Sequence, residues 1–419
     1  MNSIENLLLA PLKSFDREVF NDHLKNLSLR DRKKLIKGIC INKFSSIYLN
    51  YIKSNKIHDL FNSDEIQILK MNSKRLQIQN LEIIKEVLYL EKIFMKYHLN
   101  PVFLKGVALM DEYEDLSLRP SYDIDILFKE EEVFKAYLIL KDIGYKEHRN
   151  IELSEHELKK YSKKNHHLPN LCRNTNINIE LHHRVTSVRD FEKCPLSNNI
   201  LENKVPFNFH GVTIFKPDLN DLLVHLISHY SIQNLFNKSL RIFFDINQIE
   251  KNYNINWEKV YLSNENVKLQ KAILLTLGVL NKNLKITKSF DSFKNKFSEN
   301  FPSDEIIEVC SNKSFDVDQS IHPFTLAKIA KSDNYLSIFK EVLRVIYNSK
   351  EIIIQERGID KKNNLKILYF SMILFLRRIR IYSFSILKLI FMTGKVSKDY
   401  NSIKKIQKWI RLYIPGFKE

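Results

Sequence analysis

Two aspartates, Asp123 and Asp125, lie within a short run of strand-forming residues at 122–128. Aspartate is depleted from strands because its short polar side chain competes for backbone hydrogen bonds, so two of them in one strand need a reason. Side chains alternate between the faces of a strand, so both carboxylates point one way while Ile124 and Ile126 point toward a core. Like charges this close repel each other unless a cation lies between them. The pattern therefore predicts either a divalent-metal site or an exposed edge strand with two solvated acids.

The segment before this strand favours the metal site. Residues 101–104 form an apolar run with strand character, Lys105 and Gly106 break it, and residues 107–113 can start a helix. A glycine between strand and helix lets an anion approach the backbone, and a helix N-terminus offers unpaired N–H groups to phosphate. Arg119 follows in the loop before the two acids. Metal-binding carboxylates beside a phosphate cradle indicate nucleotide chemistry.

A second candidate strand lies at residues 176–185, which read NINIELHHRV. Here Glu180 and His182 share one face, and Ile179 and Leu181 share the other. An ordinary amphipathic strand with a polar outer face is one interpretation of this pattern. The paired aspartates upstream favour another, in which Glu180 is a third metal-binding carboxylate.

These segments resemble the core of the DNA polymerase β-type nucleotidyltransferase superfamily. The signature of that superfamily is a strand, a glycine-containing turn, a helix and an acid-x-acid strand. Lys105-Gly106, Arg119-Pro120 and the strand DIDIL at 123–127 most resemble the uncharacterised bacterial nucleotidyltransferase family, whose typical pattern is LKG…L…R…DIDLLV. The motifs cover roughly residues 81–260. The commoner superfamily turn is Gly-Ser, so nucleotide placement need not follow the better-studied members.

The resemblance implies transfer of a nucleoside monophosphate from a nucleoside triphosphate, such as ATP, to an acceptor hydroxyl, with release of pyrophosphate. Asp123 and Asp125 would bridge two Mg²⁺ or Mn²⁺ ions, and Glu180 would complete the site that activates the acceptor. The N–H groups of Gly106 and Val107 would cradle the β- and γ-phosphates. Further residues expected at the nucleotide pocket are Lys105, Arg119, His182, His229, Arg241 and Asp245. The base and the acceptor, whether a small molecule, a protein or RNA, stay open.

Pro217 is expected to open a helix on which His225 and His229 lie four residues apart. This spacing could bind zinc, but the metalloprotease motif needs glutamate directly after the first histidine, where this chain has Leu226. We therefore prefer the interpretation in which both histidines pack between helices over a zinc site. A further interpretation is that His229 lines the nucleotide pocket. On the next helix, Arg241 and Asp245 form either an i, i+4 ion pair or part of that pocket.

Two different function classes also stay open. One is a metal-dependent hydrolase built on six histidines, which are His166, His167, His182, His183, His225 and His229. The other is a non-catalytic or toxin-type nucleotide-binding module, because abortive-infection toxins of nucleotidyltransferase fold have a similar Lys-Gly and DxD arrangement. Bound zinc would favour the hydrolase, and nucleotide binding without pyrophosphate release would favour the module.

Glycine and proline are scarce, with 8 and 10 residues in 419, which indicates long helices and few glycine-rich turns. We expect an α+β fold in which a nucleotidyltransferase core at 96–260, a small mixed sheet with helices, is flanked by helical regions at 1–95 and 261–419. A long helix is predicted over 66–97 and one strand over 207–215.

Three local expectations concern the flanking regions. Ser28 and Asp31 fit a capping box at the start of a helix. Residues 281–300 are expected to be a loop, and residues 311–333 a polar, irregular segment. Residues 1–95 are interpreted as packing helices that carry no chemistry.

The positive charge is concentrated at one end of the chain. The net charge is +17, and residues 361–419 hold fourteen lysines and arginines against two acids, a net charge of +12. The uncharged run at 367–376 is followed by Arg377, Arg378 and Arg380. A membrane-spanning helix needs about 20 mostly apolar residues, so this cluster interrupts too early and we predict no transmembrane span.

Three interpretations stay open for the basic region: core helices with a basic outer face, an interfacial helix on anionic lipid, or a surface for tRNA or another RNA. Trp409, Tyr413 and Phe417 suit the last two. The four cysteines are scattered without metal-ligand spacing, and the N-terminus lacks the basic n-region of a signal peptide. These features predict a cytoplasmic protein, with peripheral membrane association as a further interpretation.

Overall fold

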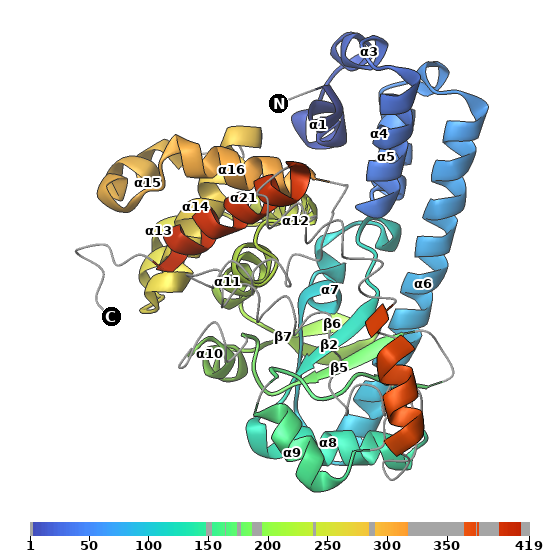
Figure 1. The fold of residues 1–419 in the computed structure, drawn as a ribbon, viewed down its shortest axis with the longest axis vertical. Helices are drawn as coiled ribbons and strands as arrows, with labels where there is room; N and C mark the ends of the chain where they lie inside the picture. The colour runs from blue at the N-terminus through green and yellow to red at the C-terminus, as the bar shows by residue number, and fades with distance from the viewer. Residues whose placement is uncertain are drawn as a thin grey trace.

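A small mixed sheet carries the two acid-bearing strands at its centre (Figure 1). The computed structural model describes residues 3–147, 153–163, 165–173, 177–186, 195–237, 240–284, 290–316, 364–373, 375–376 and 394–411. The strands of this sheet are β1 (Val102–Phe103), β2 (Asp123–Leu127), β3 (Lys146–Glu147), β4 (Leu171–Cys172) and β5 (Asn178–His182), in the order β1-β2-β5-β4-β3. Strands β2 and β5 are parallel, and the other pairs are antiparallel. The predicted α+β fold with a mixed sheet is therefore confirmed.

Two helices bury the apolar face of the sheet. They are α6 (Ser63–Lys96) and α8 (Glu130–Asp142). Ile124 and Ile126 of β2 are fully buried in one cluster with α6 residues such as Val87 and α8 residues such as Leu140. Each such side chain contributes about 1.5–3 kcal/mol when it is buried. Because side chains alternate along a strand, this packing turns the acids of β2 to the opposite face.

Helix α6 confirms the long helix predicted over 66–97. It begins at Ser63 because Asn62 and Glu65 form a capping box, in which each side chain accepts the other residue's backbone N–H. Upstream of α6 lie α1 (Ser3–Leu8), α2 (Ala10–Lys13), α3 (Arg17–Lys25), α4 (Leu29–Ile41) and α5 (Ser45–Ser54). Ser28 caps α4 by accepting the N–H of Asp31, and its hydroxyl donates to the Asp31 carboxylate, so the N-cap of the expected capping box is confirmed.

A second group of helices lies beside the acid-bearing face of the sheet (Figure 1). It comprises α10 (Leu196–Glu202), α11 (Leu219–Ser228), α12 (Arg241–Asn252), α13 (Trp257–Leu262), α14 (Val267–Leu284), α15 (Phe290–Lys296), α16 (Asp304–Phe315) and α21 (Gly394–Arg411). Helix α21 packs on α14 and α16 through Ile403, Ile406 and Ile410. The buried Lys313 and Asp399 join α16 to α21 with a contact of 2.6 Å. For α21, the interpretation as a core helix therefore holds.

Two expectations about local structure were wrong. The single strand predicted over 207–215 is a hairpin of β6 (Val205–Phe209) and β7 (Val212–Lys216). His210 and Gly211 form its turn with φ of 50° and 85°, the left-handed backbone that a tight hairpin needs, and the Gly211 N–H donates to Asn208. His-Gly is not one of the usual two-residue turn pairs, so the local sequence does not indicate a hairpin here.

The second correction concerns the expected loop at 281–300 and the expected irregular segment at 311–333. Helix α14 continues to Leu284, α15 occupies 290–296, and α16 continues to Phe315. Buried apolar side chains such as Phe290, Phe293 and Cys310 pack these helices into the core. Tertiary packing therefore outweighs the polar local composition. Residues 285–289 and 317–333 lie outside the described residues, so for them the two expectations stay predictions.

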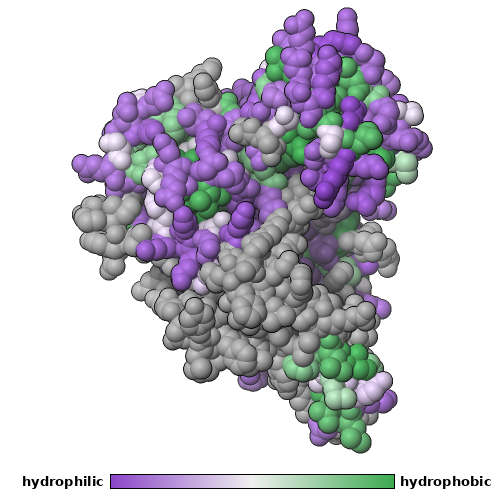
Figure 2. Space-filling view, turned by 45° about the horizontal axis from the view of Figure 1, so that its top comes forward, coloured by the Kyte–Doolittle hydropathy of each residue, from purple (hydrophilic) through white to green (hydrophobic). Residues whose placement is uncertain are grey.

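Residues 364–373, which include most of the uncharged run at 367–376, are helical and expose Leu365 (81%), Leu368 (67%) and Met372 (58%). An apolar patch is visible at the lower right of Figure 2, where this segment lies. Arg377, Arg378, Arg380, Tyr413 and Phe417 lie outside the described residues. Among the helices that the structure describes, none is long and apolar enough to cross a bilayer. Binding of lipid or RNA to this region stays a prediction.

Candidate active site

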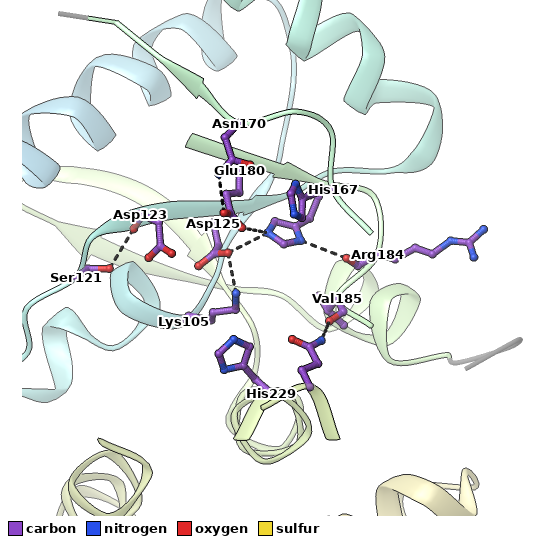
Figure 3. Close-up of polar contacts among 12 residues, drawn as sticks. Lys105, Ser121, Asp123, Asp125, His167, Asn170, Glu180, Arg184, Val185 and His229 are labelled. Carbon is purple, nitrogen blue, oxygen red and sulfur yellow. Dashed lines mark hydrogen bonds and ion pairs between the residues drawn. The ribbon is translucent and has the colours of Figure 1, made fainter. Parts of the chain in front are cut away.

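The carboxylates of Asp123 and Asp125 lie on the face of β2 that is turned away from α6 and α8 (Figure 3). Asp125 is only 2% exposed, and one of its oxygens, Oδ1, accepts hydrogen bonds from Lys105 Nζ at 2.8 Å and His182 Nε2 at 2.9 Å. Strand β2 lies between β1 and β5 in the sheet. The alternative of an exposed edge strand with two solvated acids is therefore wrong.

Glu180 lies directly beside Asp125 because of the register between two parallel strands. Asp125 of β2 pairs with Glu180 of β5, and Leu127 pairs with His182. Side chains at paired positions of parallel strands project from the same face, so the carboxylates of the two strands meet. Glu180 Oε1 accepts a hydrogen bond of 2.9 Å from Asn170, which orients the carboxylate. The structure thus brings all three predicted acids to one face of the sheet.

Three of these side chains can hold a divalent cation. Asp125, Glu180 and His182 each offer one ligand atom, and these atoms lie within 4.8 Å of one another. Carboxylate oxygens suit Mg²⁺ and Mn²⁺, and an imidazole nitrogen is accepted by most transition metals. Within the described ranges, no other set of three such groups lies this close together. Asp123 is on the neighbouring position of the same face and outside this set.

The charges around the site leave one of its acids poorly compensated. Burial opposes ionisation of Asp125, but the Lys105 ammonium and the hydrogen bond from His182 outweigh it, so the pKa of Asp125 is held well below its usual range. Burial lowers the pKa of His182, but its bonds to Asp125 and Glu180 raise it more. Burial and the charge of Asp125 raise the pKa of Asp123. Asp123 is therefore the acid whose charge the protein stabilises least, and a nearby cation would compensate it.

The Lys105-Gly106 turn has a packing reason that the sequence did not reveal. Lys105 has φ of 42° and begins the short helix α7 (Lys105–Ala108), which ends earlier than the helix expected over 107–113. A Cβ on Gly106 would lie 2.2 Å from Ser121 Oγ, so only glycine fits. The Ser121 hydroxyl in turn donates to the backbone oxygen of Asp123 at 3.0 Å. Phosphate binding by the N–H groups of Gly106 and Val107 stays a prediction.

A cavity of about 250 Å³ opens beside Asp123. It is lined by Ile41, Asn42, Lys43, Lys105, Gly106, Arg119, Ser121, Tyr122, Asp123, Leu226, His229, Tyr230, Arg241, Ile242 and Asp245. Seven of the predicted site residues are in this set, whereas Val107, Asp125, Glu180 and His182 are not. The cavity therefore adjoins the metal-binding group on the side of Asp123, and Glu180 lies on the other side.

Arg119 and Asp245 form a buried ion pair in the cavity wall. Arg119 Nε and Nη2 donate to Asp245 Oδ1 and Oδ2 at 2.7 and 3.1 Å, and the Tyr113 hydroxyl donates to the same carboxylate at 2.7 Å. Within the described part of the chain, Asp245 forms no ion pair with Arg241, so the i, i+4 interpretation is wrong. Arg241 instead donates to two backbone oxygens, those of Pro120 and Asn42.

The six histidines do not form a metal centre of their own. The rings of His166 and His167 pack against His182 at centroid distances of 5.4 and 5.3 Å. His225 is 1% exposed, which agrees with a packing histidine. His229 lines the cavity, and burial lowers its pKa to about 3, so the ring is neutral. Among the described histidines, only His182 joins a group that could share a metal, so the structure does not favour the hydrolase.

Sequence reasoning missed Lys43. It lies between α4 and α5, in a region interpreted as packing alone, and its Nζ lies 3.1 Å from the centroid of the Tyr122 ring. Lys43 has φ of 63°, a left-handed conformation that is uncommon for lysine. No local signal distinguishes Lys43 from the other lysines of this chain. Its position at the cavity depends on contact between the α4–α5 loop and Tyr122, which is distant in sequence.

The fold and the site together define a class of protein: a small mixed sheet presents a candidate carboxylate metal site beside a cavity lined with cations. The model of a family described as uncharacterised nucleotidyltransferase matches residues 45–285, which is more than half of the chain. The protein belongs to this family, which confirms the family resemblance seen in its motifs. No curated protein and no solved structure matches the chain.

Proposed function

We propose that this protein transfers a nucleoside monophosphate from a nucleoside triphosphate to an acceptor hydroxyl. The observation that carries the proposal is the convergence of Asp123, Asp125 and Glu180 on one sheet face beside a cation-lined cavity. Membership of a nucleotidyltransferase family supports the same class of reaction. In this reaction the acceptor oxygen bonds to the α-phosphorus, the bond from that phosphorus to the β-phosphate breaks, and pyrophosphate leaves.

The chain's own residues suit this chemistry. Asp125, Glu180 and His182 would hold the divalent cation, with Asp123 facing the triphosphate. Bound Mg²⁺ or Mn²⁺ would polarise the phosphate and lower the pKa of the acceptor hydroxyl. Glu180 would also accept the hydroxyl proton; Asn170 orients its carboxylate through Oε1, and Oε2 lies 3.5 Å from His182 Nε2.

Two cationic residues have assigned parts in this scheme. Lys105, whose ammonium Asp125 holds among the acids, would keep a positive charge in place near the phosphates as negative charge develops on them. Arg119 remains paired with Asp245 and shapes the cavity wall. Because this pair engages its guanidinium, Arg119 would act on the phosphate charge from a distance and not by direct contact.

The test is incubation of the purified full chain with each of the four NTPs labelled at the α-phosphate, with Mg²⁺ or Mn²⁺. Label is then sought on the protein, on added RNA and on small molecules, and pyrophosphate is measured in parallel. We expect pyrophosphate release that the Asp125→Asn variant lacks. Release of labelled product that Asp125→Asn retains would refute the proposal. NTP binding without pyrophosphate release would identify a binding module instead.

A further inference from the structure

The cavity beside Asp123 is lined by more basic than acidic side chains. Its charged lining residues are the cations Lys43, Lys105, Arg119 and Arg241 and the acids Asp123 and Asp245. Asp245 is bonded by Arg119, and Lys105 is bonded to Asp125. In the part of the chain that the structure describes, no carboxylate bonds Lys43 or Arg241. The two cations at this end of the cavity therefore lack an anionic partner.

Both cations are fixed in position by their surroundings. Arg241 Nη2 donates to the Asn42 backbone oxygen at 3.2 Å, and Nη1 donates to that of Pro120. Lys43 follows Asn42, and its ammonium lies over the Tyr122 ring. The guanidinium thus joins the α4–α5 loop to the loop before β2, and it holds Lys43 at the cavity.

Burial makes these charges expensive without an anion. It lowers the pKa of Lys43 to about 6, an effect that the charge of Arg241 reinforces. Burial also lowers the pKa of Arg241 to about 10, and the charge of Arg119 adds to this. Without an anion beside it, the Lys43 amine is therefore largely neutral at pH 7, whereas Arg241 stays charged. A polyvalent anion between the two would favour protonation of Lys43 and compensate the charge of Arg241.

The position of the cavity indicates which anion fits. Asp123 and Gly106 line the cavity, whereas Asp125, Glu180 and His182 lie beyond it. A phosphate chain whose reacting end lies at Asp125 and Glu180 would therefore extend past Asp123 into the cavity. Its far end would meet Lys43 and Arg241, which no carboxylate of the described residues bonds.

We propose that Lys43 and Arg241 form a subsite for the terminal phosphates of the nucleotide, so that the α4–α5 loop completes the active site. This inference rests on the proposed function for the identity of the nucleotide. The subsite would make the protein select triphosphates over monophosphates, because a monophosphate at the acids does not reach Lys43.

The experiment is isothermal titration of inorganic tripolyphosphate, and separately of AMP, into the full chain with Mg²⁺. Wild type is compared with Lys43→Met, with Lys43→Arg, and with Lys33→Met, which removes an exposed lysine of α4. Loss of one charge-assisted contact should weaken tripolyphosphate binding by roughly 10-fold to 100-fold in Lys43→Met. Lys43→Arg should retain most of the affinity, Lys33→Met should match wild type, and AMP binding should be unchanged throughout.

Equal tripolyphosphate affinity in wild type and Lys43→Met would overturn the subsite, and so would equal weakening in Lys33→Met. Absence of tripolyphosphate binding to wild type would overturn it as well. Circular dichroism of each variant checks that the fold is retained. Because the readout is binding of a probe without a nucleoside, a protein that binds tripolyphosphate through Lys43 but transfers no nucleotide would refute the proposed function alone.

Discussion

Replacement of Lys43 by methionine is expected to stabilise the folded protein, although it removes a cation from the proposed phosphate subsite. Burial, reinforced by Arg241, lowers the pKa of Lys43 from 10.5 to about 6. The charged groups that act on its ammonium most strongly are Arg241, Asp123, Arg119 and Arg75. Methionine fills a similar volume without a charge, so the unfavourable burial of the ammonium is removed.

The magnitude follows from proton linkage. One pKa unit corresponds to about 1.4 kcal/mol. At pH 7 the unfolded chain keeps the lysine proton that the folded chain has largely lost. The interval between pH 7 and the unfolded pKa of 10.5 therefore sets the cost of burying Lys43 at roughly 5 kcal/mol at most. Relaxation around the side chain reduces this cost. We expect Lys43→Met to raise the free energy of unfolding by about 2–4 kcal/mol at pH 7.

The sign of the pH dependence is fixed by the lowered pKa. Between pH 6 and 10.5 the unfolded wild type binds more protons at Lys43 than the folded protein does, so this residue makes wild-type stability rise with pH. The variant lacks that rise. Its advantage is therefore largest below pH 6 and shrinks by about 1.4 kcal/mol per pH unit above pH 7.

The assay is urea unfolding followed by circular dichroism at pH 7, 8 and 9, without nucleotide, for wild type, Lys43→Met and the control Lys33→Met. The control should follow wild type at every pH, since its side chain is exposed. A Lys43→Met variant that is no more stable than wild type at pH 7 would refute the reasoning. An advantage that is the same at pH 7 and 9 would show that it comes from packing and not from the charge.

Two further predictions concern substitutions whose effect on stability follows from the site geometry. In thermal unfolding with EDTA, Asp123→Asn should raise the melting temperature because it removes a poorly stabilised charge, whereas Asp125→Asn should lower stability by about 3 kcal/mol because it leaves Lys105 buried without its partner. Shifts of the same sign would contradict this. Gly106→Ala should destabilise by about 2 kcal/mol through its clash with Ser121, and Ser121→Gly should restore part of the loss when the two are combined. Calorimetry on the two single variants and the double variant measures these stability changes. If the changes of the single variants simply add in the double variant, the loss does not come from a clash with Ser121.

The features predicted correctly from the sequence are those that local patterns encode. Alternating apolar residues placed Asp123 and Asp125 on one face of a strand and Glu180 on the corresponding face of another, and the structure agrees. The pairing of Arg119 with Asp245 joins residues 126 positions apart, and no local pattern announces it. The site was thus predictable where one strand or turn carries it, and not where distant segments meet.

The same distinction explains the overlooked contribution of the N-terminal helices. Their apolar spacing predicts packing, and packing is what most of their residues do. Lys43 differs only because its loop meets Tyr122 and Arg241, which are remote in sequence. A single lysine among 66 basic residues carries no signal until tertiary structure gives it neighbours.

The link from Arg241 to the Asn42 carbonyl bears on where the functional unit begins. The family-matched region starts at residue 45, so a chain trimmed to that boundary would lose Lys43 together with the oxygen that anchors Arg241. Such a fragment would retain the three acids and yet leave the cavity without one wall. Relatives are best sorted by whether a lysine separates two helices just upstream of the shared region, because that single position distinguishes chains that keep this wall from chains that have lost it.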